Sequence, residues 1–136
     1  MRLRLLTSTP AVETLIAAAI LSTTSGAAPS MLFHRLSREP EKVADVVGRL
    51  EVQHGSVLEH NRMSWLVEAS EGEILKILLQ NRFFTFTRLG SMSWLLSSNL
   101  RTVVEYQEEG DDFSLKLFDS IKDIVPSLYV NRRLAA

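Results

Sequence analysis

Hydrophobic and polar residues follow two different periods along the chain. An apolar residue at every second position is typical of a strand with one buried face, and apolar spacings of three and four are typical of an amphipathic helix. The two-residue period predicts strands at Arg2–Thr7, Met63–Ala69 and Phe83–Leu89. The helical period, together with capping residues, predicts helices at Pro10–Ser22, Ser37–Val52, Glu71–Gln80, Asn99–Glu108 and Asp111–Val125.

Residues that cap or break helices mark the predicted boundaries. Thr9 is the predicted N-cap of the first helix, and Glu13 lies near the positive end of that helix dipole. Other boundaries are predicted at Ser37, at Ser97 or Ser98, at Gly110 and at Pro126. Thr23–Leu36 is rich in Ser, Thr, Gly, Ala and Pro and shows no period, so it is predicted to be a loop.

Composition narrows the class of protein. The 136 residues are 46% hydrophobic and 23% charged, which predicts one globular domain over residues 1–136. A net charge of −1 lacks the basic excess that binds phosphate backbones, so nucleic acid is not an expected partner. The absence of Cys excludes disulfides, thiolate metal sites and a cysteine nucleophile. His54 and His60 are too far out of helical phase to share one helix face, and no metal site is expected.

The N-terminal segment has some features of a secretion signal, because Arg2 and Arg4 precede the apolar run Leu15–Leu21. The Thr9-Pro10 pair interrupts that pattern and indicates a helix start instead. No apolar run reaches the ~18 residues that a membrane-spanning helix needs. We therefore expect residues 1–30 to stay in the folded protein, no membrane partner, and a cytoplasmic location.

Polar side chains suited to binding a ligand gather in Gln53–His60, beside the apolar residues Val57 and Leu58. Two histidines, a serine and a glutamate occur within this stretch. Each has a structural alternative. A histidine between apolar neighbours is often a hydrogen-bonded structural residue, and Glu59 can pair with Arg62 or cap a turn.

Arg82 and Arg101 are the main candidates for binding an anion, because guanidinium groups among apolar residues need anionic partners. In one interpretation the partner is a ligand, and in the other it is Glu59 or Glu105. The three phenylalanines within residues 83–86 favour core packing over stacking on an aromatic ligand.

Three segments, taken in order, resemble the flavin-dependent thymidylate synthases, the ThyX family. Residues His54–His60 read His-Gly-Ser-Val-Leu-Glu-His and are similar to the family's Gly-His-x-Ser-Val-Leu-Glu-His segment. The strand at Met63–Ala69 and the helix after it correspond to the next family elements, and Asn99-Leu100-Arg101 is similar to the family's Asn-x-Arg segment.

The resemblance implies an α+β fold with a small mixed or antiparallel sheet and packed helices, in subunits that form homotetramers and share each FAD site. It implies methylation of dUMP to dTMP, with FAD reduced by NADPH and methylene-tetrahydrofolate as carbon donor. The catalytic residues are not identified. By the same resemblance, FAD would be bound by His54, Ser56, Arg82, Asn99 and Arg101. The planar fork of arginine suits a pyrophosphate.

The family's Arg-His-Arg signature, which continues to a serine and contributes to flavin and nucleotide binding, is largely replaced. The aligned residues are Gln80-Asn81-Arg82, and Gly90 takes the place of the serine. A further family arginine, which helps to ionise the pyrimidine ring, is replaced by Gly110. Because these positions offer no cation to the dUMP phosphate, we expect dUMP methylation to be weak or absent.

Three functions remain open at this point. The first is a thymidylate-synthase-like protein that binds FAD or a nucleotide with weakened or lost catalysis. The second is a non-catalytic homo-oligomeric protein that retains the fold, and the third is one subunit of a split enzyme. Self-association, as a tetramer, is expected from the resemblance and from the apolar stripe of Asp111–Val125, which is longer than a small sheet is expected to cover.

Overall fold

The computed structural model describes the backbone of residues 1–50 and 52–135 and the side chains of residues 1–50 and 55–130. In this part of the chain, four antiparallel strands form an open sheet in the order β1-β2-β4-β3. The strands are β1 (Arg2–Ser8), β2 (Arg62–Glu68), β3 (Thr85–Arg88) and β4 (Ser93–Asn99). The predicted α+β class is therefore confirmed, and the sheet is antiparallel.

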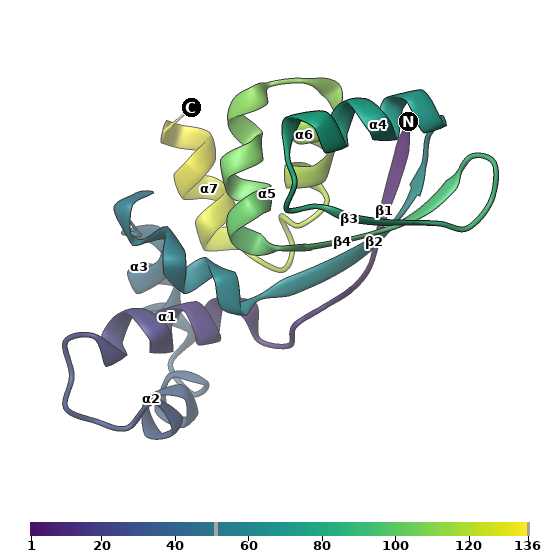
Figure 1. Ribbon diagram of the computed structural model, residues 1–136. Helices are drawn as coiled ribbons and strands as arrows, with labels where there is room; N and C mark the ends of the chain where they lie inside the picture. The colour runs from purple at the N-terminus through teal and green to yellow at the C-terminus, as the bar shows by residue number, and fades with distance from the viewer. Residues whose placement is uncertain (51, 136) are drawn as a thin grey trace.

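Helices pack on one face of the sheet and beside its end (Figure 1). The N-terminal group contains α1 (Val12–Ser22), α2 (Pro29–Leu36) and α3 (Pro40–Gly48), followed by the 3₁₀ helix η1 (Val52–His60). The remaining helices are α4 (Glu71–Gln80), α5 (Leu100–Tyr106), the 3₁₀ turn η2 (Gln107–Glu109), α6 (Asp112–Asp119) and α7 (Pro126–Ala135). Within these elements, no helix of the described chain is long and apolar enough to cross a membrane.

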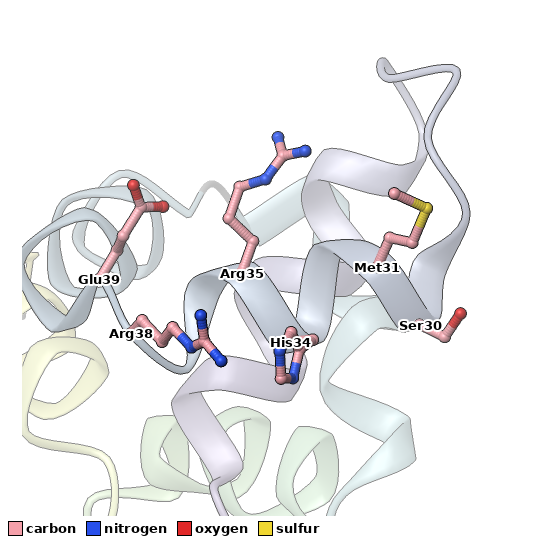
Figure 2. Close-up of a pocket in the computed structure, with 6 residues that line it drawn as sticks. All are labelled: Ser30, Met31, His34, Arg35, Arg38 and Glu39. Carbon is pink, nitrogen blue, oxygen red and sulfur yellow. The ribbon is translucent and has the colours of Figure 1, made fainter.

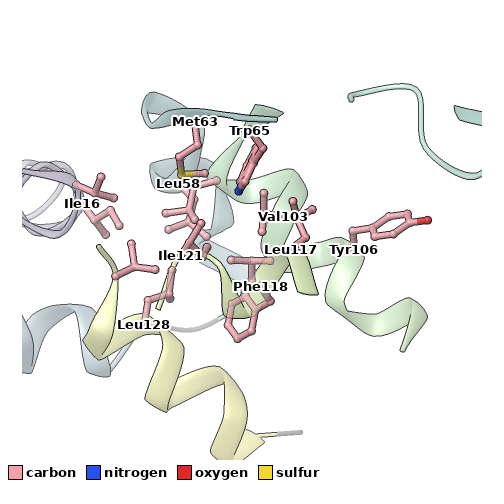
Figure 3. Close-up of a cluster of buried hydrophobic side chains, with 14 of the residues drawn as sticks. Ile16, Leu58, Met63, Trp65, Val103, Tyr106, Leu117, Phe118, Ile121 and Leu128 are labelled. Atoms are coloured by element: carbon pink, nitrogen blue, oxygen red, sulfur yellow. The ribbon is translucent and has the colours of Figure 1, made fainter. Parts of the chain in front are cut away.

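One hydrophobic core joins the sheet to both groups of helices. Alternate residues of β2 point into it, as the period of two predicted, and Trp65 is completely buried. Figure 3 shows Ile16 of α1, Leu58 of η1, Met63 of β2 and Ile121 of the turn after α6 gathered in this core. The indole nitrogen of Trp65 donates to Ser120 Oγ at 2.8 Å, so the ring is buried without losing its hydrogen bond.

The segment predicted as a loop contains a helix, α2. Pro29 occupies the first turn, where its missing amide hydrogen costs nothing. Leu32 and Leu36, one turn apart, are both buried, and α2 packs against α1. The prediction for Thr23–Leu36 was wrong because this two-leucine stripe is too short to stand out in a sequence rich in small residues.

Two predicted helix caps were also wrong. Neither Ser97 nor Ser98 caps a helix, because both belong to β4, a strand that the sequence pattern did not reveal. Asn99 is the N-cap of α5. Ser37 instead donates to the carbonyl of His34 at the end of α2, and α3 begins three residues later at Pro40.

The first helix starts differently from the prediction. Ala11, in the left-handed region with φ of 50°, precedes α1. Thr9 does not cap it and instead extends the pairing of β1 with β2, since its hydroxyl oxygen accepts from the Arg62 amide at 3.0 Å. The strand therefore continues up to the turn, and the threonine belongs to the sheet edge.

The apolar stripe of the C-terminal region is covered within the chain. Asp111 caps α6, as predicted, but this helix ends at Asp119, and Pro126 starts α7 where the sequence predicted a helix stop. The stripe is buried at Phe113, Leu117, Phe118, Ile121 and Val125. The argument that this stripe requires a second copy was therefore wrong, because α6, α7 and the sheet together bury it.

Candidate functional site

The junction between η1 and α5 brings together two of the segments on which the resemblance rests. Leu58 of η1 and Leu100 of α5 are both buried, and the two helices pack against each other. The amide of Leu100 donates to the carbonyl of Asn61 at 2.8 Å. This bond and the pairing of Arg62 with Asn99 hold the end of η1 against the start of α5.

Arg101 is the charged centre of this junction. Its Nη1 donates to Glu59 Oε1 at 2.6 Å and its Nε donates to Glu105 Oε1 at 2.9 Å. Hydrogen bonds to Glu105 and Glu59 raise the pKa of the Arg101 guanidinium, so it remains cationic. The second interpretation of its partners is therefore confirmed, and Glu59 pairs with Arg101 rather than with Arg62.

The Arg101 side chain is not buried. It is 39% exposed, and both carboxylates are more exposed than the guanidinium. Exposed ion pairs each contribute little to stability because water competes for both groups. Arg101 is consequently a cation that solvent can reach, although its two carboxylate partners give the cluster a formal charge of −1.

Gly55 provides the room for this guanidinium, a role that the sequence did not reveal. A Cβ atom at Gly55 would lie 3.3 Å from Arg101 Nε, which is closer than an ordinary contact. The glycine also brings the backbone of η1 directly beneath the charged group. In the sequence, the only indication of this role is that Gly55 lies between His54 and Ser56 in the segment that resembles the ThyX family.

Asn99 and Ser56 belong to the two segments that meet at this junction. Asn99 Oδ1 accepts from the Thr102 amide at 2.8 Å and so caps α5, which leaves the Asn99 amide nitrogen without a hydrogen-bond partner among the described residues. Ser56 follows Gly55 on η1 and is exposed. Both side chains retain a hydrogen-bond donor for a ligand.

Arg82 lies elsewhere and is exposed, so the expectation that it is embedded among apolar residues was wrong. Its guanidinium carbon is 5.1 Å from the centre of the Phe83 ring, and the described residues offer it no ion pair. Both residues line a hollow of about 370 Å³ at the end of α4. Tyr106 donates to Gln80 Oε1 at 2.7 Å, which places this end of α4 beside the last residue of α5. Arg101 is in the first turn of α5, so Arg82 and Arg101 lie at opposite ends of that helix.

A buried carboxamide lies next to the junction. Asn61, between η1 and β2, is completely buried, and neither Oδ1 nor Nδ2 has a hydrogen-bond partner in the part of the chain that the structure describes. Burying such a group without a partner costs ~1–3 kcal/mol for each unsatisfied atom. This residue was not singled out from the sequence, because nothing in a sequence distinguishes a buried asparagine from an exposed one.

The two histidines with described side chains, His34 and His60, lie on different elements, α2 and η1. The side chain of His54 lies outside the described residues, and His60 is exposed at the end of η1. His34 lines a separate hollow of about 520 Å³ with Arg35 and Arg38 (Figure 2). Among the described side chains, no group of three His, Asp or Glu residues is arranged to hold a metal ion.

Comparison with known proteins adds no relative: no family model matches the chain, and no curated protein matches it.

Proposed function

We propose that the chain is a ThyX-like protein that binds the pyrophosphate of FAD, or the phosphate of a related nucleotide, at the junction of η1 and α5. The observation that carries the proposal is the accessible Arg101 guanidinium at this junction. Its ion pair with Glu59 joins the two segments that carry Ser56 and Asn99. Ser56, Asn99 and Arg101 are three of the five residues that the family resemblance assigns to FAD.

The donor set suits a pyrophosphate. Arginine presents a planar fork to phosphate oxygens, and the Ser56 hydroxyl and the Asn99 amide add neutral donors. A pyrophosphate group would replace Glu59 or Glu105 on the guanidinium, and the released carboxylate would turn into solvent. When bound, the flavin supplies the redox chemistry, and the residues of this chain bind and orient it.

The nucleotide side of the family site has no counterpart here, and we include weak or lost dUMP methylation in the proposal. Gly90 and Met92 belong to the exposed connection between β3 and β4. Gly110 ends η2 with φ of 68°, so an arginine at this position would also strain the backbone. No cation from these positions is present to offset desolvation of the dUMP phosphate.

Arg82 lies apart from the Arg101 site. Arg82 and Arg101 lie at opposite ends of α5, so the two guanidinium groups of one copy do not meet at one phosphate. A homotetramer with shared FAD sites, as the resemblance implies, is part of the proposal. A cytoplasmic location belongs to the same proposal.

A non-catalytic protein is the second candidate, and one observation favours it. Arg101 already has two carboxylate partners within its own chain, so the junction is complete without a ligand. In that case Glu59 and Arg101 only fasten η1 to α5. The third possibility, a subunit of a split enzyme, would place the missing cations on another chain.

Separate titrations with FAD and with dUMP, followed by calorimetry, test the proposal. FAD should bind and dUMP should not. Arg101→Ala should weaken FAD binding by about 10- to 30-fold, which corresponds to roughly 1.4–2 kcal/mol. Glu59→Gln should strengthen it a few-fold, because the competing carboxylate is removed.

The matched control is Arg35→Ala/Arg38→Ala, which removes two cations from the hollow between α2 and α3 and should leave FAD affinity unchanged. If FAD affinity falls in the Arg35→Ala/Arg38→Ala variant and does not fall in Arg101→Ala, the ligand lies in that hollow. Absence of FAD binding in the folded protein would support the non-catalytic candidate instead.

A further inference from the structure

Helix α4 carries apolar side chains on two opposite sides. Ile74 and Ile77 point into the core and are buried. Leu75, Leu78 and Leu79 are exposed, and Leu79 is 81% exposed. Phe83, just after the helix, is 59% exposed. The sequence predicted one buried stripe here, and the structure shows that only Ile74 and Ile77 of that stripe are covered.

The exposed leucines form a continuous strip. Positions 75, 78 and 79 are separated by three and four residues, so they lie next to one another along one side of the helix. Single exposed leucines are ordinary on protein surfaces, whereas a contiguous apolar strip marks an interaction site. Figure 1 shows α4 at the periphery of the molecule, on the outside of the helical layer.

We propose that this strip pairs with the same strip of a second copy, with the two α4 helices antiparallel. Charge complementarity selects a second copy as the partner. Glu71 lies in the first turn of α4 and Arg82 follows its last turn, so the helix is acidic at its start and basic just beyond its end.

Antiparallel pairing about the middle of the strip sets Leu75 against the partner's Leu79. The same register places Glu71 beyond the end of the partner's α4, within one residue of the partner's Arg82, and two-fold symmetry makes each contact twice. Parallel pairing would place Glu71 against the partner's Glu71, and this attraction would be lost. Antiparallel helix dipoles also oppose each other favourably.

Both charged residues are available for the pairing. Glu71 has a long 3.4 Å contact with Arg88, and its side chain is 72% exposed. Arg82 is exposed over the Phe83 ring. A Cβ atom added at Gly72, the residue after Glu71 in the first turn of α4, would meet no atom closer than Ser70 Oγ at 4.0 Å, so the partner's Phe83 can approach the helix backbone there. The pairing does not depend on any bound ligand.

Sedimentation equilibrium at micromolar concentration tests this pairing. The unaltered chain should form a dimer or a larger even-numbered assembly. Leu79→Lys should weaken association at least tenfold, because a cation replaces the most exposed leucine of the strip. The matched control is Leu115→Lys on α6, where an exposed leucine lies outside the strip, and association should not change. Circular dichroism checks that each variant is folded.

Charge reversal distinguishes the antiparallel arrangement from others. Glu71→Arg and Arg82→Glu should each weaken association, and the double variant Glu71→Arg/Arg82→Glu should restore it. A monomeric unaltered chain, unchanged association in Leu79→Lys, or no restoration in the double variant would overturn the pairing. FAD titration tests the Arg101 site at the other end of α5. A failure of the proposed FAD binding is therefore measured separately from a failure of the α4 pairing.

Discussion

Glu13 Oε2 accepts a hydrogen bond from the backbone amide of Ser127 at 2.9 Å, although 114 residues separate the two. The same oxygen accepts from the Leu128 amide at 3.0 Å. A residue in the first turn of α1 thus caps the first turn of α7, where unpaired amide groups need acceptors. This contact ties the N-terminal helices to the C-terminal one.

Glu13→Ala should therefore lower the free energy of unfolding by about 1–2 kcal/mol, the range for loss of a helix N-cap. Glu13→Gln keeps an oxygen acceptor and should cost less. Urea denaturation followed by circular dichroism measures both. Equal effects of the two substitutions would mean that the charge, rather than the hydrogen bonds, provides the stabilisation.

Asn61→Leu should leave the free energy of unfolding unchanged or raise it by about 1–2 kcal/mol, because an apolar side chain of similar size removes a buried carboxamide that has no partner. Asn61→Asp should instead destabilise the protein by ~3 kcal/mol or more at neutral pH, since it buries an unpaired charge. Thermal unfolding measured at pH 7 and pH 4.5 separates the two effects. A clear loss of stability in Asn61→Leu would show that the carboxamide is hydrogen-bonded in solution.

Tyr106 should make the protein sensitive to alkali. Burial, and then the charges of Asp111 and Glu109, raise the pKa of its hydroxyl from 10.0 to about 12. The folded state therefore holds this proton more tightly than the unfolded state, so the stabilisation is complete below pH 10 and is lost as the pH rises to about 12.

The expected loss over this interval is on the order of 2 kcal/mol. Urea denaturation between pH 9 and pH 12 measures it, with Tyr106→Phe as the control because phenylalanine cannot titrate. The stability difference between the two proteins should shrink as the pH rises. A constant difference would contradict the pKa shift and leave only the loss of the Tyr106–Gln80 hydrogen bond.

Gly55→Ala should disturb the ligand site more than the fold. The added Cβ would come within 3.3 Å of Arg101 Nε, and the flexible arginine can shift by a few tenths of an ångström. Replacing glycine also reduces the entropy of the unfolded chain, a gain of about 0.4–1 kcal/mol that offsets the strain. We expect a stability change within about 0.5 kcal/mol and a several-fold loss of FAD affinity. Gly48→Ala, where no atom lies within 4 Å of an added Cβ, is the matched control.

Elements with a strong local period were predictable from the sequence. The alternation in β2 puts one side of the strand in the core, and the Ser70-x-x-Glu73 pattern forms a capping box at the start of α4. These features depend on residues close in sequence, so their physical causes are visible in a single stretch of chain. The Arg101 segment was also identified as a candidate site from a local pattern, the sequence Asn99-Leu100-Arg101.

Only the tertiary structure decided the contacts between distant segments. β4 became a strand because β2 and β3 pair with its two edges, although the sequence of Ser93–Asn99, Ser-Trp-Leu-Leu-Ser-Ser-Asn, does not alternate between apolar and polar residues. Arg101 proved to be paired with Glu59 and Glu105, and Arg82 lies at the other end of α5. Glu13 lies in the first turn of its own helix, as predicted, and it also caps α7, which the sequence did not reveal. The sequence by itself determined where helices and strands can form, because propensity and periodicity act over a few residues. It did not determine which charged or polar group meets which, because that depends on how the packed core brings together residues far apart in the chain.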